Sequence, residues 1–207
     1  MSSLRKLVAI GFLLLGVTGG RALLFLAING TSPEPVKATF LPMPRPLPDF
    51  ALLHHQGQLF TRDNFRGRWQ IVFFGFTNCP DICPATLQQL AIARDRVLAD
   101  GGRFPQIVLV SVDPDRDSPD VLERYVANFG DDVIGVTGEM AELEKLTRPL
   151  GIYFARSGEA DTDGSYNVDH SAFVLLIDSA AEWRALFGPP HDVASFVHDV
   201  PLLMDAG

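Results

Sequence analysis

Residues 71–84 of the chain read Ile-Val-Phe-Phe-Gly-Phe-Thr-Asn-Cys-Pro-Asp-Ile-Cys-Pro, and this stretch decides the fold. Its first half, residues 71–76, is an apolar run of the kind that forms a buried strand. Its second half contains the only two cysteines of the chain, Cys79 and Cys83. Pro84 suits the first turn of a helix. The two thiols are therefore expected at a strand-to-helix turn, where α/β proteins commonly build their sites.

The spacing of the two cysteines limits what they can do. Residues i and i+4 of a helix share one face, and their Cα atoms lie on the order of 6 Å apart. Disulfide geometry accepts such separations, and a helix N-terminus favours thiolate over thiol. The pair is therefore able to bind one soft metal ion or to close as a disulfide. A purely structural disulfide is disfavoured, because it would close a very short loop and stabilise little.

Periodicity and turn residues predict the rest of the domain. Around the strand of residues 69–77 and the helix of residues 84–99, we expect a hairpin (50–53 and 58–61, turning at Gly57), a strand (106–112), two helices (118–129 and 139–148), a short strand (152–155), a polar loop (156–169), a second hairpin (171–177 and 182–187) and a last helix (191–204). A strand–helix–strand half followed by a hairpin and a helix resembles the thioredoxin-like arrangement. The expected fold class is α/β, with a mixed sheet flanked by helices over residues 49–207.

The first 28 residues are expected to lie outside this fold as a membrane anchor. Arg5 and Lys6 precede residues 7–28, which are almost wholly apolar and long enough to cross a bilayer. Arg21 would cost about 2.5–3.5 kcal/mol at the bilayer centre, but near the outer interface it can snorkel. We favour an uncleaved anchor over a cleaved signal peptide. The basic residues keep the N-terminus cytoplasmic, so the domain is expected to face the periplasm from the cytoplasmic membrane.

Residues 29–48 contain six prolines and are expected to form a semi-rigid tether between anchor and domain. The roughly 160 residues that remain of the 207 suit one globular domain. The net charge is −8 without a basic cluster, which disfavours nucleic-acid binding.

A metal site needs a third donor besides the two thiolates, and the chain has five histidines. Solvent exposure is the simplest expectation for four of them, which lie in the first hairpin turn and on the last helix: His54, His55, His191 and His198. His170 differs, because it stands at the end of the polar loop and at the mouth of a predicted central strand. Two thiolates and one imidazole suit copper in either oxidation state, whereas zinc usually takes a fourth donor.

Three blocks of the sequence resemble the Sco/SenC family, the copper chaperones of cytochrome c oxidase assembly. They are residues 74–84, residues 111–119 (Ser-Val-Asp-Pro-Asp-Arg-Asp-Ser-Pro) and residues 168–171 (Val-Asp-His-Ser). The resemblance extends roughly from residue 48 to the C-terminus. It implies a thioredoxin-like domain that binds one copper ion, as Cu(I) or Cu(II), through Cys79, Cys83 and His170.

The resemblance also implies a function and partners. The expected function is delivery of copper to the CuA site of cytochrome c oxidase subunit II, by a metallochaperone rather than an enzyme. The alternative is a thiol-disulfide reductase that acts on the cysteines of that copper site, with Cys79 and Cys83 as its redox-active pair. Further expected partners are a second periplasmic copper chaperone or a thiol-disulfide oxidoreductase. A peroxiredoxin-like peroxidase is disfavoured, because no arginine lies in the cysteine motif.

Three residues near the thiols have two interpretations each. Asp113 follows the second buried strand, where it could orient the site or simply form a turn. Arg116 could be a docking contact or a solvated charge. For Asp81, a carboxylate cap on the helix N-terminus is favoured over metal ligation.

Overall fold

The computed structural model describes residues 34–157 and 166–206. Nearly all of the described residues belong to one compact unit, residues 35–207. The predicted anchor lies outside the described ranges. Within those ranges no helix combines the length and the apolar character that crossing a membrane requires.

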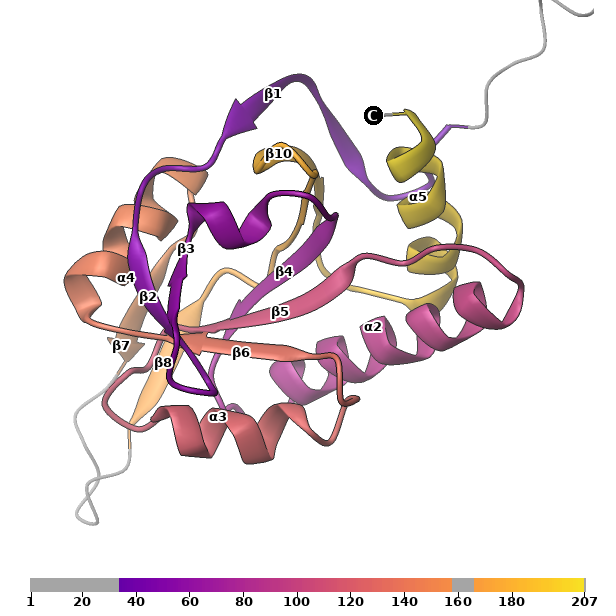
Figure 1. Cartoon of the computed structure of the whole chain (residues 1–207). Helices are drawn as coiled ribbons and strands as arrows, with labels where there is room; N and C mark the ends of the chain where they lie inside the picture. Colours follow the sequence, from indigo (N-terminus) through magenta and orange to yellow (C-terminus); the bar gives the residue numbers. More distant parts are fainter. Residues whose placement is uncertain (1–33, 158–165, 207) are drawn as a thin grey trace, which may run out of the picture. The chain divides into compact units, whose positions relative to one another are not determined.

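The elements follow one another in mixed order along the chain. They are β1 (Thr39–Pro46), β2 (Ala51–His54), β3 (Leu59–Thr61), η1 (Arg62–Phe65), β4 (Gln70–Gly75), α2 (Ile82–Ala99), β5 (Gln106–Ser111), α3 (Pro119–Val126), β6 (Ile134–Thr137), α4 (Met140–Thr147), η2 (Arg148–Leu150), β7 (Phe154–Ser157), β8 (Asn167–His170), β9 (Val174–Ile177), β10 (Glu182–Phe187) and α5 (Val193–Ala206) (Figure 1).

Eight of the strands form one mixed sheet in the order β1-β10-β9-β4-β5-β6-β2-β3. Strands β4, β5 and β6 are parallel, and the other pairs are antiparallel. Every residue of β4 is buried, because helices cover both faces at the centre of the sheet. The remaining two strands, β7 and β8, pair only with each other.

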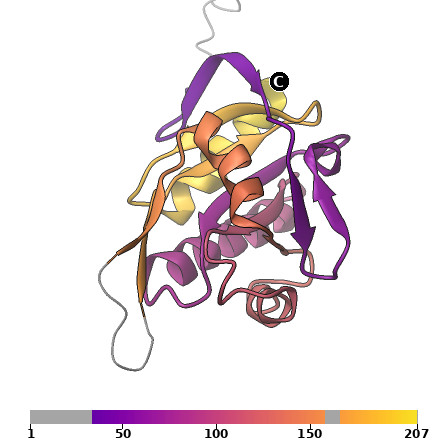
Figure 2. The same ribbon diagram turned by 90° about the vertical axis from the view of Figure 1, so that its left-hand side faces the viewer.

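Alternation along β4 assigns the helices to the two faces of the sheet. Leu146 of α4 and Leu150 of η2 lie against Val72 and Phe74. The other face, which carries Phe73, receives the N-terminal turn of α2. Helix α5 packs beside α2, and α3 packs on β6 (Figures 1 and 2).

Gly75 allows α2 to approach the end of β4. A Cβ atom at this position would lie 2.9 Å from the Cys83 sulfur and 2.8 Å from the Phe73 ring. Both separations are shorter than van der Waals contact allows. The glycine in the apolar run is therefore what places Cys83 directly over the central strand.

The thioredoxin-like fold is confirmed, and most of the predicted elements are present with ends that differ by a few residues. Three strands were missed: β1, which lies in the predicted tether, β6 and β8. Strand β6 has only four residues, too few for a clear periodic signal. Strand β8 lies within the predicted polar loop and ends at His170.

The predicted tether is shorter than expected, because its second half belongs to the domain. Residues 39–46 form β1, which pairs with β10 at the edge of the sheet. Prolines are tolerated on edge strands, where a missing N–H leaves no ladder bond unmade. A proline-rich sequence therefore fits an edge strand as well as a free linker, and composition alone did not distinguish them.

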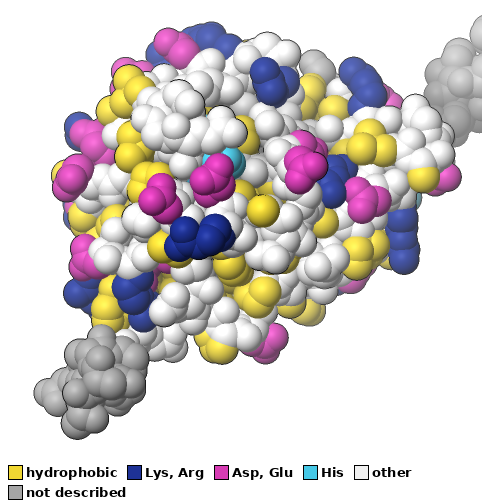
Figure 3. Space-filling model, turned by 60° about the horizontal axis from the view of Figure 1, so that its bottom comes forward, with side chains coloured by type: hydrophobic (Ala, Val, Ile, Leu, Met, Phe, Trp, Pro, Cys, Tyr) yellow, Lys and Arg dark blue, Asp and Glu magenta, His cyan; other side chains and the backbone are white. Residues whose placement is uncertain are grey.

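Acidic and basic side chains alternate on the face shown in Figure 3, and no continuous basic area is visible there. Nucleic-acid-binding proteins instead cluster Lys and Arg in a patch or stripe on one face.

Candidate metal centre

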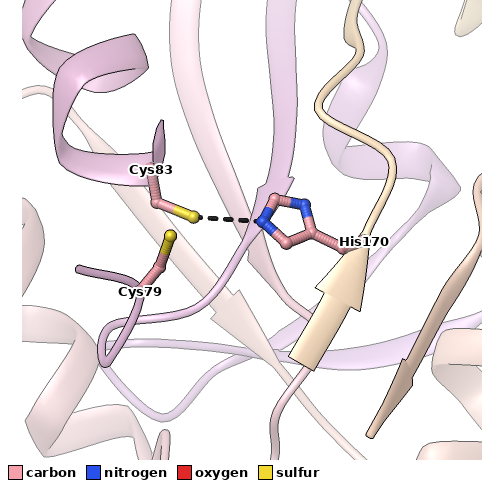
Figure 4. A group of neighbouring side chains, drawn as sticks. All are labelled: Cys79, Cys83 and His170. Carbon is pink, nitrogen blue, oxygen red and sulfur yellow. Dashed lines mark hydrogen bonds between the residues drawn. The ribbon is translucent and has the colours of Figure 1, made fainter. Parts of the chain in front are cut away.

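Cys79, Cys83 and His170 come together at the carboxyl end of β4 (Figure 4). Their ligand atoms all lie within 4.8 Å of one another, and Nε2 of His170 is 3.3 Å from the sulfur of Cys83. His170 is 87 positions from Cys83 in the chain, so only the folded domain can assemble this group.

The two cysteines occupy different local structures. Cys83 is the second residue of α2, whereas Cys79 lies in the turn before the helix. The expectation that both lie on one helical face was therefore wrong. Instead, the backbone N–H groups of Asp81 and Cys83, at the start of the helix, help to lower the pKa of Cys79. Asp81 is the N-cap residue as predicted, but its carboxylate makes no capping hydrogen bond.

Hydrogen bonding separates the protonation behaviour of the two thiols. The thiol of Cys83 donates to the sulfur of Cys79 and, against the opposing effect of burial, lowers the pKa of Cys79 to about 4. His170 and the backbone N–H groups add to this effect. The same hydrogen bond, together with burial, raises the pKa of Cys83. Cys79 is thus the thiolate of the pair at neutral pH.

The His170 imidazole is oriented by its surroundings. Its Nδ1 atom faces the carbonyl oxygen of Ser171 at 3.3 Å, which directs Nε2 toward the sulfurs. The edges of the Phe73 and Phe76 rings meet it, with centroid separations of 6.0 and 5.7 Å. A hydrogen-bonded, packed imidazole is the usual form of a metal-binding histidine.

The loop between β5 and α3 braces the cysteine turn through Asp117. This carboxylate is fully buried and accepts hydrogen bonds from the backbone and hydroxyl of Thr77 and from the hydroxyl of Ser111. Sequence reasoning missed Asp117, because an aspartate in a Pro- and Ser-containing loop looks like an ordinary turn residue.

The same loop reaches the histidine side of the site through Asp113 and Arg116. Asp113 is buried and accepts hydrogen bonds from Arg116 and from the hydroxyl of Tyr166. Arg116 is not a solvated charge, since its guanidinium also donates to the backbone carbonyl of Tyr166 and its side chain is only 20% exposed. Sequence reasoning did not single out Tyr166, one aromatic residue in a polar segment.

The other four histidines lie outside this cluster. Two of them are more enclosed than expected. His55 accepts a hydrogen bond from the backbone of Gly135, and His191 lies 2.7 Å from the carbonyl oxygen of Ala172. His198 is exposed, as expected.

The donor set fits copper. It consists of two sulfurs and one imidazole nitrogen, which copper accepts as Cu(I) and as Cu(II). The two sulfurs are not joined in a disulfide, so each is placed to act as a ligand. No fourth histidine, cysteine or carboxylate of the described residues joins the group. A hollow of about 290 Å³ beside Cys79 and His170 opens the site to solvent.

Comparison with known proteins identifies the family. The SCO1/SenC family profile matches residues 43–205. The chain belongs to the SCO1/SenC family. It is 32% identical over 192 residues to a SCO2-like protein of Rickettsia prowazekii, an alignment that covers 90% of each chain. It is 37% identical over 151 residues to the mitochondrial SCO1 homolog 1 of Arabidopsis thaliana.

That second alignment covers 73% of this chain but only 45% of the Arabidopsis protein, so the chain spans about half of this mitochondrial relative. Among solved structures, copper-bound ScoI of Arabidopsis thaliana superposes with a TM-score of 0.73 at 35% identity. The superposition covers 78% of this chain and 99% of that one. Copper is bound in that Arabidopsis structure and in a structure of yeast Sco1, and the Cys-Cys-His group of this chain offers donors of the kind that copper accepts.

Proposed function

We propose that this protein is a copper chaperone that holds one copper ion between Cys79, Cys83 and His170 and delivers it to the CuA site of cytochrome c oxidase subunit II. The observation that carries the proposal is the convergence of two sulfurs and one imidazole within 4.8 Å at a solvent-facing hollow. A site built for permanent storage of a metal ion would be closed by further ligands.

Ligand exchange is the mechanism that this arrangement supports. Cys79 lies beside the hollow and carries the thiolate, whereas Cys83 is fully buried. A ligand of the acceptor would approach through the hollow and replace protein ligands one at a time. Copper passes between thiolate and imidazole donors, and each exchange keeps the ion coordinated throughout.

The proposal includes a location and partners. An N-terminal anchor over residues 1–28 would hold the domain at the periplasmic face of the cytoplasmic membrane, where subunit II presents its CuA domain. The basic pair Arg5 and Lys6 before the apolar stretch supports this orientation. A second periplasmic copper chaperone is the proposed copper donor, and a thiol-disulfide oxidoreductase would keep the cysteines reduced.

A second candidate function is reduction of the disulfide between the CuA cysteines. The lowered pKa of Cys79 favours it. The Cys79 thiolate would attack one sulfur of the partner's disulfide and form a mixed disulfide, releasing a partner thiolate that takes a proton. Cys83 would then lose its proton and attack Cys79, releasing the second partner thiol. The products are a reduced partner and a Cys79–Cys83 disulfide.

One experiment tests both functions. The copper-loaded full chain in detergent is mixed with the metal-free CuA domain, once with its cysteines reduced and once oxidised. We expect the wild type to produce the CuA absorption and paramagnetic resonance signals on the reduced domain. The His170→Ala variant should produce no such signals, whereas the exposed control variant His198→Ala should produce them as the wild type does. If no signal forms with the wild type, delivery to CuA is wrong. Reduction of the oxidised domain that survives His170→Ala without copper would favour the reductase.

A further inference from the structure

The hairpin that carries His170 is not part of the main sheet. Strands β7 and β8 pair only with each other, so no ladder of backbone hydrogen bonds fixes them to the strand that leads to the cysteines. The position of His170 relative to the sulfurs therefore depends on how this two-stranded unit is attached to the rest of the domain.

Tyr166, immediately before β8, makes the principal polar attachment. Its hydroxyl donates to Asp113 Oδ1 at 2.6 Å, and its backbone carbonyl accepts from Arg116 Nη1 at 2.9 Å. The Arg116 guanidinium also lies 3.8 Å from the centroid of the tyrosine ring. Asp113 is only 2% exposed, so these contacts form where water screens them poorly.

The Arg116 guanidinium also lies close to Phe76, whose ring packs against His170. It lies 5.7 Å from the centroid of the Phe76 ring, and the Phe76 ring meets the His170 ring at 5.7 Å. One side chain thus contacts the start of β8 and the ring that packs against the imidazole at the end of β8. Arg116 itself is held by Asp113.

We propose that Arg116 and Tyr166 form a clamp that fixes the β7–β8 hairpin to the loop after β5 and so positions His170 opposite Cys79 and Cys83. The two residues are positioning residues, since neither belongs to the group of candidate ligands. The clamp deepens the proposed function, because it rests on His170 as a copper ligand, but it does not depend on delivery to the oxidase.

Other contacts at the hairpin are weaker determinants. The ion pair between Arg156 and Asp115 is half-exposed on both sides, and such pairs contribute little. The hydrogen bonds between Tyr153 and Ser171 lie at the base of the hairpin itself. Val168 is buried, but an apolar contact does not fix the direction in which His170 points.

Copper affinity is the first test. In the full chain in detergent, Tyr166→Phe removes one hydroxyl and is expected to weaken Cu(I) binding at least about tenfold in competition with a chelator, the effect of one charge-assisted hydrogen bond. Arg116→Lys is expected to act in the same direction, because an ammonium cannot form the same fork or stack. Tyr153→Phe is the matched control: Tyr153 lies directly before β7 and is 63% exposed, and no change is expected.

A double-mutant cycle separates positioning from general destabilisation. If the clamp acts through His170, Tyr166→Phe weakens copper binding in the wild type and has no further effect in a His170→Ala background. Equal weakening in both backgrounds would overturn the proposal. An unchanged affinity of the Tyr166→Phe variant in the wild-type background would overturn it as well, provided that His170→Ala alone weakens binding.

A measurement on the metal-free protein tests whether the clamp positions His170, even if His170 proves not to be a ligand. Nuclear Overhauser contacts between the Phe76 and His170 rings are expected in the metal-free wild type and in Tyr153→Phe. They should weaken or disappear in Tyr166→Phe and in Arg116→Lys. Contacts that persist unchanged in both clamp variants would contradict the proposal. The affinity of His170→Ala, measured separately, reports on the ligand set alone.

Discussion

Asp117 accepts two hydrogen bonds from Thr77, one from the backbone N–H at 3.0 Å and one from the hydroxyl at 2.5 Å. Thr77 stands two positions before Cys79, so the loop after β5 holds the cysteine turn directly. Through Asp113 the same loop also holds Tyr166, which lies immediately before β8 and four positions before His170. Residues 113–117 of this loop therefore join the two halves of a site whose ligand atoms come from distant parts of the chain.

Asp117→Asn is expected to lower the free energy of unfolding by about 1–3 kcal/mol, the range for leaving buried partners of a charged group unsatisfied. An amide has one acceptor oxygen, so its NH₂ group would face at least one of the donors that Asp117 now binds. Denaturant unfolding of the metal-free protein measures the change. Asp131→Asn, at an exposed position, is the control. Equal midpoints for the two variants would show that the brace contributes nothing.

Reactivity of the thiols provides a second prediction. Because the Cys83 thiol and nearby N–H groups hold the pKa of Cys79 at about 4, iodoacetamide should modify Cys79 at pH 6 while the buried Cys83 stays unmodified. The rate should be nearly constant above about pH 5 and fall as the pH drops through about 4. Mass spectrometry of the peptides identifies the modified residue.

Replacing the donor tests the cause of this shift. In Cys83→Ala the hydrogen bond from residue 83 is gone, so the pKa of Cys79 should move toward its ordinary value and the rate profile toward higher pH. A wild-type rate that still rises steeply between pH 7 and 9 would mean that Cys79 is an ordinary thiol.

The sequence allowed the centre of the fold and the ligand group to be predicted, because each has a local signal. Three local signals lie within 14 residues. The apolar run ending at Phe76 predicts a strand, the two cysteines predict a site, and Pro84 predicts the start of a helix. His170 was separable from the other four histidines by its place before an apolar strand. The resemblance of three blocks to one family then connected it with the thiols.

What could not be predicted depends on contacts between distant residues. The role of β1 is decided by its pairing with β10, which composition does not reveal. The same holds for Asp117 and Tyr166, whose importance follows from partners 40 and 53 positions away. A charged or aromatic residue in a polar loop has no local feature that indicates such a partner.

The paired histidines of the first hairpin predict a pH effect on stability. Burial is the main cause that lowers the pKa of His54 and of His55, whose rings are 4.3 Å apart. The unfolded chain therefore takes up protons first as the pH falls. The stabilisation of the folded domain by these two neutral histidines is complete above their pKa in the unfolded chain, about 6.5. It is lost as the pH falls through their lower pKa values in the folded protein.

Histidine titration by nuclear magnetic resonance should show the pKa values of both His54 and His55 below the ordinary histidine value of about 6.5. Thermal unfolding between pH 7.5 and 5 should show the matching loss of stability, and His55→Phe should reduce it. A titration in which His54 and His55 both show the ordinary histidine pKa of about 6.5 would remove the basis of this prediction.

Asp199 of α5 is expected to hold residues 36–38, the N-terminal arm of the domain, in place. It is fully buried and accepts hydrogen bonds from the backbone N–H groups of Val36, Lys37 and Ala38. Burial opposes its ionisation, but these donors and His198 outweigh it and hold the pKa of Asp199 below the ordinary range. Its contribution is therefore present above about pH 4 and is lost as the pH falls through the folded value.

Asp199→Asn should release residues 36–38 and lower the free energy of unfolding at pH 7 by about 1–3 kcal/mol. Hydrogen exchange at these three amides should rise toward that of an unstructured chain, because one amide oxygen cannot replace a carboxylate that binds all three. Asp205→Asn, on the same helix and with its side chain 73% exposed, is the matched control. If exchange at residues 36–38 is already fast in the wild type, the arm is free and the short tether inferred from β1 is wrong.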